Sequence, residues 1–224
     1  MEGLLLLNKP AGKTSFAMVS ALRRLLKVKT IGHAGTLDPF ATGLLLMLIG
    51  KKYTQRSNEF LNFDKEYNAQ VRLGIETDTY DCTGAQTAYS HESPSLEQLE
   101  AALAQFQGQV SQIPPMFSAK KVKGKKLYEL ARKGIVIERQ PVLVQMNIQL
   151  LGYSYPHIEL KVSCSKGTYI RSLAHDLGKA LGCGGHLAAL QRTRCGPYHL
   201  ADSFDGMLLE QSHCLQDLLK ALKR

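Results

Sequence analysis

The sequence predicts an α+β fold, because segments with the two-residue period of strands alternate along the chain with segments that have the period of helices. Residues 142–150 and 158–164 each alternate apolar and polar side chains and are joined by a short link, which favours antiparallel pairing. Residues 95–106 carry apolar side chains at helical spacing. A chain of 224 residues can bury about 70% of its unfolded surface, so its core needs no disulfide staples.

Three further strands are expected in the first third of the chain. Gly3 to Lys9 and Leu44 to Ile49 are short apolar runs next to turn residues, which is typical of buried strands. Lys65 to Leu73 instead alternates between two faces. The alternation places the Tyr67 hydroxyl on the buried side, where a tyrosine is most often part of the core.

Amphipathic helices are expected after the turn at residues 10–15, at residues 95–106, after Gly167 and after a cap at Ser212. The segment 95–106 is the clearest of these. It opens with a capping box formed by Ser95 and Gln98, and Gly108 is expected to end it. Its expected apolar stripe is Leu96, Leu99, Leu103 and Phe106.

The chain carries 28 Lys and Arg against 19 Asp and Glu, a net charge of +9. This excess favours a polyanionic partner, with nucleic acid the first expectation and an anionic membrane the second. Five lysines between residues 120 and 126 would repel one another unless they faced water or phosphates. A second basic stripe is Arg23, Arg24, Lys27 and Lys29.

Several classes of protein are disfavoured by the sequence. Gly12-Lys13-Thr14 is not the end of a P-loop, because Leu7 stands where that motif requires glycine. The five cysteines are scattered and are expected to be free thiols, and the pair Cys183 and His186 has no second pair with which to bind a metal. The leucine run at residues 4–7 is too short for a signal peptide or a membrane span, so we expect a cytoplasmic protein that does not bind membranes.

The stretch Gly32 to Gly43 places the carboxylate of Asp38 among glycines, directly before an apolar run. Pro39 disfavours the helical region at Asp38, so the backbone restricts the direction in which this side chain points. One reading is a turn whose polar groups bond the local backbone, and the other is a carboxylate presented for chemistry. The carboxylates of the polar loop at residues 76–81 fit a solvated turn or, less well, a hard-metal site.

Arg171 lies one residue from the apolar stripe of its predicted helix. An unpaired buried charge is very costly, so we expect this guanidinium to have an acidic partner.

Together these segments resemble the ordered motifs of the TruB-type tRNA pseudouridine synthases. The resemblance covers about residues 3–200 and implies a pseudouridine synthase fold, with a central, mostly antiparallel mixed sheet flanked by helices and loops. The matching segments are residues 32–43, 65–67 with 71–74, 77–79, 112–120, 166–173 and 190–196.

The resemblance implies isomerisation of a uridine in the T-loop of tRNA, at position 55, after the base is flipped out of its stack. Asp38 matches the family's catalytic aspartate, Tyr67 its active-site tyrosine and Arg171 its active-site arginine. Further substrate contacts are expected from His33, which matches a histidine associated with flipped-out nucleotides, Leu190, which matches a leucine of the uracil pocket, and Tyr169, Lys9 and Lys120. Contacts to the RNA backbone are expected from Lys121, Lys123, Lys125, Lys126, Arg23 and Arg24.

The implied chemistry is consistent with the residue types. A carboxylate with a reference pKa of about 3.9 is ionised near neutral pH, so Asp38 could act as a nucleophile held bidentately by Arg171. Attack on the sugar, attack on the uracil ring and a glycal-like route all stay open. Tyr67 could stack on the base or transfer a proton in any of them. Because substrate and product are isomers, no cofactor and no metal are expected.

The resemblance further implies a single catalytic domain over residues 1–224, with a short helical tail at about 202–224 and no complete C-terminal PUA domain. We expect a monomer that binds the T-arm of tRNA and has no obligate protein partner. Two alternatives remain: an RNA-binding or tRNA-folding module whose catalysis is incidental, and a pseudouridine synthase that acts on another RNA.

Overall fold

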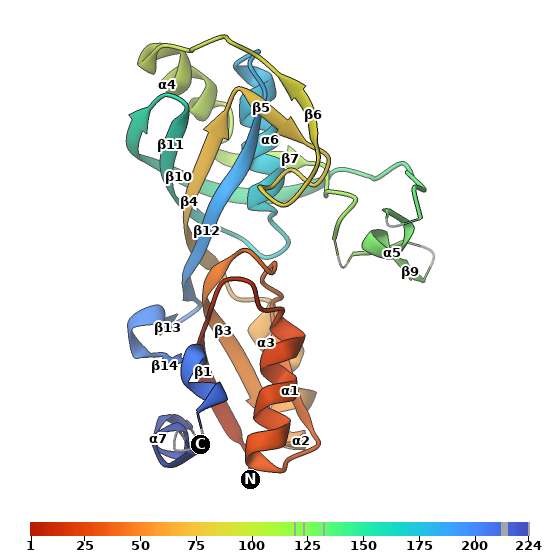
Figure 1. Cartoon of the computed structure of the whole chain (residues 1–224), viewed down its shortest axis with the longest axis vertical. Helices are drawn as coiled ribbons and strands as arrows, with labels where there is room; N and C mark the ends of the chain where they lie inside the picture. Colours follow the sequence, from red (N-terminus) through yellow and green to blue (C-terminus); the bar gives the residue numbers. More distant parts are fainter. Residues whose placement is uncertain (119, 123, 132, 212–214, 224) are drawn as a thin grey trace. The chain divides into compact units, whose positions relative to one another are not determined.

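The computed structural model describes residues 1–118, 120–122, 124–131, 133–211 and 215–223 and confirms the α+β class, with a mixed sheet flanked by helices (Figure 1). The chain forms two compact units. Unit 1 comprises Met1–Asn68 and Leu190–Arg224, and unit 2 comprises Ala69–Ala189. The chain passes between the units inside strands β4 (Lys65–Leu73) and β12 (Gly185–Cys195), so no linker in the sequence marks the division.

In unit 1 the strand order is β14-β1-β3-β12-β4. Strand β1 (Gly3–Lys9) pairs antiparallel with β3 (Thr42–Ile49) over its whole length, and β2 (Ile31–Ala34) pairs antiparallel with the second half of β3. Strand β12 runs parallel to the start of β3, and β14 (Phe204–Asp205) runs parallel to β1. Strand β13 (Tyr198–His199) extends the sheet antiparallel to β12.

The core of unit 1 forms on both faces of β1 and β3, whose side chains are buried at nearly every position. This confirms the two buried strands expected at residues 3–9 and 44–49. Helix α1 (Ser15–Leu26) packs against β2 and buries Val19, Leu22 and Leu26, the predicted apolar face. The short helices α2 (Lys51–Gln55) and α3 (Ser57–Leu61) follow β3.

In unit 2 the strand order continues as β12-β4-β11-β10-β7. Strands β10 (Val142–Ser154) and β11 (His157–Cys164) are antiparallel, with Ile148 opposite Val162, and this confirms the pair expected from their alternation. Strand β4 buries every second residue from Lys65 to Leu73, Tyr67 included, as its pattern predicts. Two further pairs form separate two-stranded sheets, β5 (Ile75–Thr77) with β6 (Gln86–Tyr89) and β8 (Lys121–Val122) with β9 (Lys125–Lys126).

The helices of unit 2 are α4 (Leu96–Ala104), α5 (Leu127–Ala131) and α6 (Ile170–Ala180), and α4 packs against α6. The capping box of Ser95 and Gln98 is present. The prediction of a helix to Phe106 with Leu96 on the buried stripe is wrong, because α4 ends at Ala104 and Leu96 is 49% exposed. Gly108 does not end the helix but starts β7 (Gly108–Gln112). Periodicity defines one face of a helix but not how far its packing partner extends.

The C-terminal part of unit 1 contains two 3-10 turns, η1 (Leu200–Asp202) and η2 (Gly206–Glu210), and helix α7 (Leu215–Ala221). Helix α7 buries Leu218. The predicted cap at Ser212 lies outside the described residues. Within the ranges that the structure describes, no helix has the length and apolar composition needed to cross a bilayer.

Gly43→Ala is expected to lower the free energy of unfolding by about 3 kcal/mol, because a Cβ at this position would meet backbone in a strained conformation. Gly43 has a φ of +101°, and its Cβ would lie 2.4 Å from the carbonyl oxygen of Arg192. Urea unfolding measures the loss. The control is Gly12→Ala, whose φ is +77° with nothing within 4 Å of the added Cβ, so it carries only the backbone term of about 1 kcal/mol. Equal losses in the two variants would contradict the close approach.

Candidate active site

The loop of residues 35–41, between β2 and β3, carries Asp38 and is fixed by hydrogen bonds on both sides of it. The Ser15 hydroxyl donates to the Leu37 carbonyl at 3.1 Å and accepts from the Leu37 amide at 2.9 Å. The Gly12 amide donates to the Pro39 carbonyl at 2.8 Å, and the Ala41 amide donates to the Asp38 carbonyl at 3.1 Å. The backbone that presents the half-buried Asp38 side chain is therefore anchored at the residues before and after it.

Lys9 supports the same loop from the end of β1. Its ammonium is fully buried and donates to the carbonyls of Pro10 at 2.8 Å, Lys13 at 2.7 Å and Pro39 at 3.2 Å. Burial, and to a smaller extent the Arg192 charge, lower the pKa of Lys9 to about 8, against the opposing effect of the Asp38 carboxylate. An ammonium has three donors. All three bond the protein backbone, so Lys9 holds two turns together. Its expected contact with substrate stays a prediction.

Arg192, on β12, holds the other side of the loop. Its guanidinium is 1% exposed, donates through Nε to the Leu44 carbonyl at 2.6 Å and donates through Nη2 to the Gly35 carbonyl at 2.9 Å. The sequence analysis assigned no role to this residue. The available signal was its place two residues after Leu190, which the alternation of a strand puts on the same face.

His33, Tyr67 and Leu190 complete the candidate residues of unit 1. The Nδ1 atom of His33 is buried and has no hydrogen-bond partner among the described residues. Burial, and then the Arg192 charge, lower the pKa of His33 below its ordinary value of 6.5, so the ring is neutral at neutral pH. Tyr67 and Leu190 are each 9% exposed. Unit 1 thus carries the carboxylate of Asp38 on an anchored loop and the neutral imidazole of His33. It also carries two nearly buried side chains, those of Tyr67 and Leu190.

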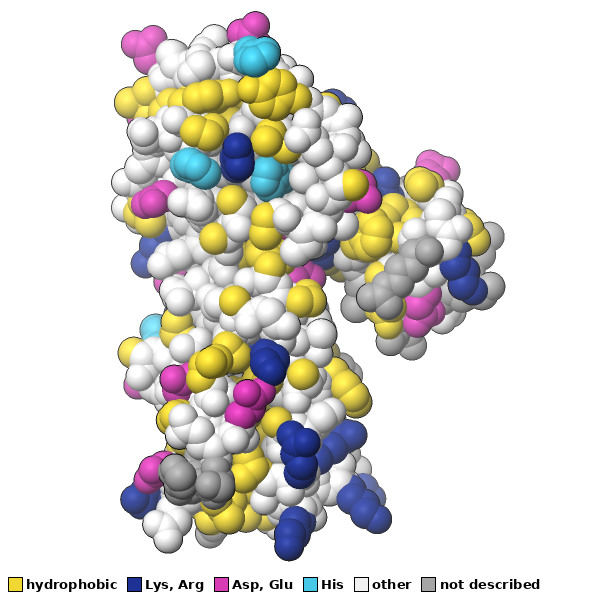
Figure 2. Space-filling view, in the orientation of Figure 1, with side chains coloured by type: hydrophobic (Ala, Val, Ile, Leu, Met, Phe, Trp, Pro, Cys, Tyr) yellow, Lys and Arg dark blue, Asp and Glu magenta, His cyan; other side chains and the backbone are white. Residues whose placement is uncertain are grey.

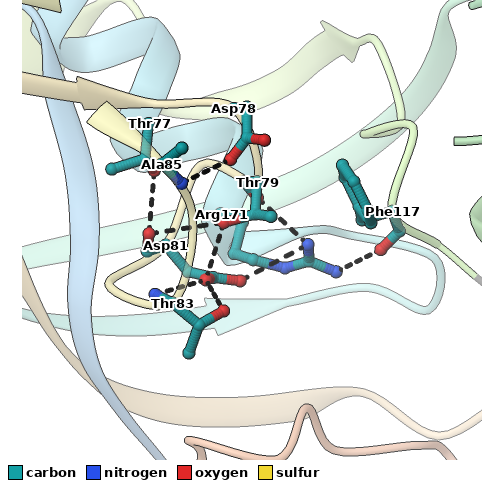
Figure 3. Close-up of polar contacts among 8 residues, drawn as sticks. All are labelled: Thr77, Asp78, Thr79, Asp81, Thr83, Ala85, Phe117 and Arg171. Atoms are coloured by element: carbon teal, nitrogen blue, oxygen red, sulfur yellow. Dashed lines mark hydrogen bonds and ion pairs between the residues drawn. The ribbon is translucent and has the colours of Figure 1, made fainter. Parts of the chain in front are cut away.

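Arg171 occupies the first turn of α6 in unit 2, where its guanidinium is 5% exposed. One Nη atom lies 3.6 Å from a carboxylate oxygen of Asp81 and donates to the Thr79 carbonyl at 3.1 Å. The other donates to the Phe117 carbonyl at 2.7 Å. Figure 3 shows this guanidinium pointing from α6 between the loop of residues 77–85 and Phe117. The expectation that Arg171 has an acidic partner is confirmed.

Asp81 is the residue that the sequence analysis missed. It was placed in a solvated turn or among metal ligands, but its carboxylate is buried and pairs with Arg171. Its Oδ1 atom accepts from the Thr79 hydroxyl at 2.8 Å, the Thr83 amide at 2.9 Å and the Thr83 hydroxyl at 2.6 Å (Figure 3). Among the described residues, no group of three His, Cys, Asp or Glu side chains could hold a metal ion. The loop is folded to pair a carboxylate with an arginine.

Tyr169 precedes α6 and is fixed by the amide of Gln112. The Tyr169 amide donates to Gln112 Oε1 at 2.8 Å, and Gln112 Nε2 donates to the Tyr169 carbonyl at 3.0 Å. The Ser172 hydroxyl donates to the Ile113 carbonyl at 2.9 Å. The segment after β7 therefore sets the start of the helix that carries Arg171.

The expected RNA-backbone residues are only partly described. Lys120 is half-buried and its carbonyl accepts from the Leu127 amide at 2.9 Å. Lys123 lies outside the described residues, as do the side chains of Lys121, Lys125 and Lys126 in the β8–β9 hairpin. Arg23 and Arg24 are exposed on α1. Figure 2 shows basic side chains gathered over this helix in the lower part of the view.

Comparison with known proteins identifies the class to which this fold and these residues belong. Residues 23–170 match the family model described as TruB family pseudouridylate synthase (N terminal domain), and residues 171–223 match that of the tRNA pseudouridylate synthase B C-terminal domain. Over 99% of its length the chain resembles a solved Cbf5-Nop10-Gar1 complex, with a TM-score of 0.76 and 26% identity. The match spans 59% of that structure's chain. The fold and the site define a pseudouridine synthase, which is an isomerase.

Similar sequences make the assignment more specific. A protein of Protochlamydia amoebophila named tRNA pseudouridine synthase B is 57% identical over 206 residues, which are 92% of this chain and 79% of the relative. One of the same name from Chlamydia pneumoniae is 55% identical over 209 residues, 93% of this chain and 89% of the relative. The chain belongs to the TruB family, whose substrate is tRNA.

Asp81→Asn is expected to lower the rate of pseudouridine formation about ten- to a hundredfold, because the replacement removes the charge that faces Arg171 and lets that guanidinium move. Oδ1 of the asparagine can still accept from Thr79 and Thr83, so the melting temperature should fall by only a few degrees. Single-turnover assays and thermal unfolding measure the two effects. The control is Asp78→Asn, since Asp78 is exposed and accepts from the Ala85 amide in the same loop. Activity in Asp81→Asn equal to that of the control would contradict the role of the pair.

Proposed function

We propose that this protein converts uridine 55 in the T-loop of tRNA to pseudouridine, with Asp38 as the nucleophile acting on a base flipped out of its stack. The observation that carries the proposal is the anchored loop of residues 35–41, which fixes the backbone on both sides of a half-buried carboxylate. A turn that merely satisfied its own polar groups would not need Lys9 and Arg192 buried beside it. Burying these two cations costs free energy. Holding the loop that presents Asp38 is a reason for that cost.

The reaction exchanges one bond to the sugar for another. The bond between C1′ and N1 of the uracil breaks, the base turns, and a bond forms between C1′ and C5. C5 then loses its proton, and N1 of the product carries one, so atoms and electrons balance without an oxidant or a phosphate donor. Asp38, ionised at neutral pH, either bonds covalently to C1′ or to the ring, or accepts the proton that gives a glycal-like intermediate.

The neighbouring residues suit the remaining tasks. The Tyr67 ring, nearly buried, can stack on the base while its hydroxyl transfers a proton. The neutral ring of His33 can occupy the place of a displaced nucleotide in the T-loop without placing a second cation near Asp38. Leu190 supplies an apolar wall, and Tyr169 a further aromatic surface. To Arg171 with Asp81 we assign an electrostatic role in the same reaction.

The RNA is held through its phosphates by two basic segments, the lysines of residues 120–126 and the exposed stripe on and after α1. The stripe comprises Arg23, Arg24, Lys27 and Lys29, and each of these is exposed. Arg23 also donates to the Ile31 carbonyl at 2.8 Å, which fixes its side chain. Such contacts give affinity without reading sequence.

Similarity favours tRNA over another RNA as the substrate. Relatives named tRNA pseudouridine synthase B share 57% and 55% identity with this chain, whereas the Cbf5 complex shares 26%. Nop10 and Gar1 accompany Cbf5 in that structure. We propose that this chain, in contrast, acts as a monomer and finds the T-arm without a protein partner.

Asp38→Asn is expected to lower pseudouridine formation on an unmodified tRNA transcript at least about a thousandfold, because an amide is not a nucleophile of comparable strength. Binding of the transcript should stay within about threefold of the wild type, since the loop is held by its backbone. Chemical adduct formation with primer extension maps the product, and a transcript with cytidine at position 55 tests the site. Asp64→Asn, at an exposed carboxylate of unit 1, is the control. An active Asp38→Asn variant, or modification elsewhere in the transcript, would overturn the proposal.

Replacing Lys121 and Lys123 together by alanine is expected to make the salt dependence of RNA binding shallower by about 1.5 in log K against log[salt], because each lysine that neutralises a phosphate contributes about 0.7–0.9. Titrations of a T-arm hairpin at several salt concentrations measure the slope. Lys179→Ala, at an exposed lysine near the end of α6, should leave it unchanged. If the double variant keeps the wild-type slope, the hairpin does not contact phosphates.

A further inference from the structure

Tyr80 has a backbone conformation that a bulky residue rarely adopts. Its φ is +64°, and the only other described non-glycine residue with a positive φ is Lys27. The left-handed region costs an ordinary residue about 1–2 kcal/mol. Such a conformation persists only where surrounding contacts impose it.

Tyr80 is held through its backbone and through its ring. Its amide donates to the Thr77 carbonyl at 3.2 Å and its carbonyl accepts from the Leu187 amide at 3.0 Å, while its ring stacks on that of His175. The two ring centroids are 3.9 Å apart and the planes differ by 8°. The Nδ1 atom of His175 is buried and has no hydrogen-bond partner among the described residues. Ring stacking, rather than a hydrogen bond from Nδ1, thus fixes the imidazole.

The stack joins the same two elements as the Arg171–Asp81 pair. His175 lies one turn after Arg171 on α6, so their side chains share a face of that helix. Tyr80 lies between Thr79, whose carbonyl accepts from Arg171, and Asp81, whose carboxylate pairs with Arg171. Helix α6 therefore holds three consecutive residues of the loop, through the guanidinium at the outer two and through the imidazole at the middle one.

The left-handed conformation of Tyr80 turns the chain so that its two neighbours both face Arg171. If Tyr80 returned to a negative φ, the Thr79 carbonyl and the Asp81 side chain would rotate relative to each other. The room for adjustment is small, because the loop closes tightly around Gly84, where an added Cβ would lie 2.3 Å from the Thr79 hydroxyl. Arg171 would then lose its contact with the Thr79 carbonyl or its contact with the Asp81 carboxylate.

We propose that Tyr80 and His175 are positioning residues for the reaction, which hold the 77–85 loop in the strained conformation that orients Arg171 and Asp81. The inference rests on the proposed function, in which Arg171 and Asp81 act on the reaction electrostatically. Neither ring needs to touch the substrate. Their effect on the rate passes through the arginine.

Substitutions can separate the stack from the backbone strain. Tyr80→Phe and His175→Phe keep two stacked rings and should retain kcat within about twofold of the wild type. Tyr80→Ala and His175→Ala remove the stack and should lower kcat about tenfold or more with little change in KM, because a small misplacement of an active-site group has effects of this size. Tyr80→Gly removes the stack but accepts the positive φ without strain. It should be more stable than Tyr80→Ala and equally slow.

The protein contains its own matched control. Tyr89 and His91 are also an aromatic pair in unit 2, with centroids 4.7 Å apart and planes at 90°, and both are exposed. Tyr89→Ala and His91→Ala should leave kcat and KM unchanged. Wild-type kcat in Tyr80→Gly or His175→Ala would overturn the proposal, as would equal losses in Tyr80→Ala and Tyr89→Ala.

Two further measurements exclude a merely structural role. In an Asp81→Asn background, Tyr80→Ala should lower kcat by less than about twofold, because both changes act through Arg171; additive losses would overturn the proposal. Amide hydrogen exchange of Tyr80 and Thr83, whose amides donate to the Thr77 carbonyl and to Asp81, should be faster in Tyr80→Ala. This exchange is independent of activity. A wild type inactive on tRNA would reject the proposed function, whereas unchanged exchange would reject the stack as a support of the loop.

Discussion

The close approach of β3 and β12 at Gly43 and Arg192 is the constraint on which unit 1 depends. The missing side chain of Gly43 lets the backbone of Arg192 pass within contact, and the guanidinium can then reach the Gly35 and Leu44 carbonyls. Burying a cation whose hydrogen bonds go to neutral carbonyls costs free energy. This cost is tolerated because Arg192 joins a strand to the loop that carries Asp38. Burial is the main cause of the lowered pKa values of Lys9 and His33, and the Arg192 charge adds to it, so this residue contributes to both the shape and the electrostatics of the unit.

Unit 2 uses a buried arginine in a related way. Arg171 donates to the carbonyls of Thr79 and Phe117, which belong to two different loops, while Arg192 donates to carbonyls on either side of the Asp38 loop. The planar fork of a guanidinium offers several donors in fixed directions, so one side chain can hold two backbone segments at once. Lysine lacks this geometry. In Lys9 a single nitrogen donates to three carbonyls, which must all approach that atom. The two arginines differ in that Arg171 also faces a carboxylate, that of Asp81.

Periodicity in the sequence predicted much of the fold, whereas the sequence predicted the candidate site only in part. The apolar runs at β1 and β3 and the alternation of β4 and β10 are local patterns, and the structure confirms them. The need of Arg171 for an acidic partner also followed from its neighbours in sequence. The carboxylate named for it from the sequence was Asp38, and Asp81 was not singled out, because Glu76, Asp78 and Asp81 look alike in a polar loop. The burial of Asp81 depends on the fold of that loop, in which Tyr80 has a positive φ. The burial of Lys9 and Arg192 was likewise invisible, since charged residues in a sequence indicate exposure unless their partners are known.

Unit 1 is assembled from both ends of the described chain, with the whole of unit 2 inserted between its two segments. During synthesis the Asp38 loop leaves the ribosome long before Arg192 does. Until then, the carboxylate lacks the guanidinium that fixes its loop, and β3 lacks its parallel neighbour. Closing so long a connection is slow compared with local folding. A nascent chain therefore displays the Asp38 loop before the contacts that fix it can form, and these contacts come only when β12 has been translated.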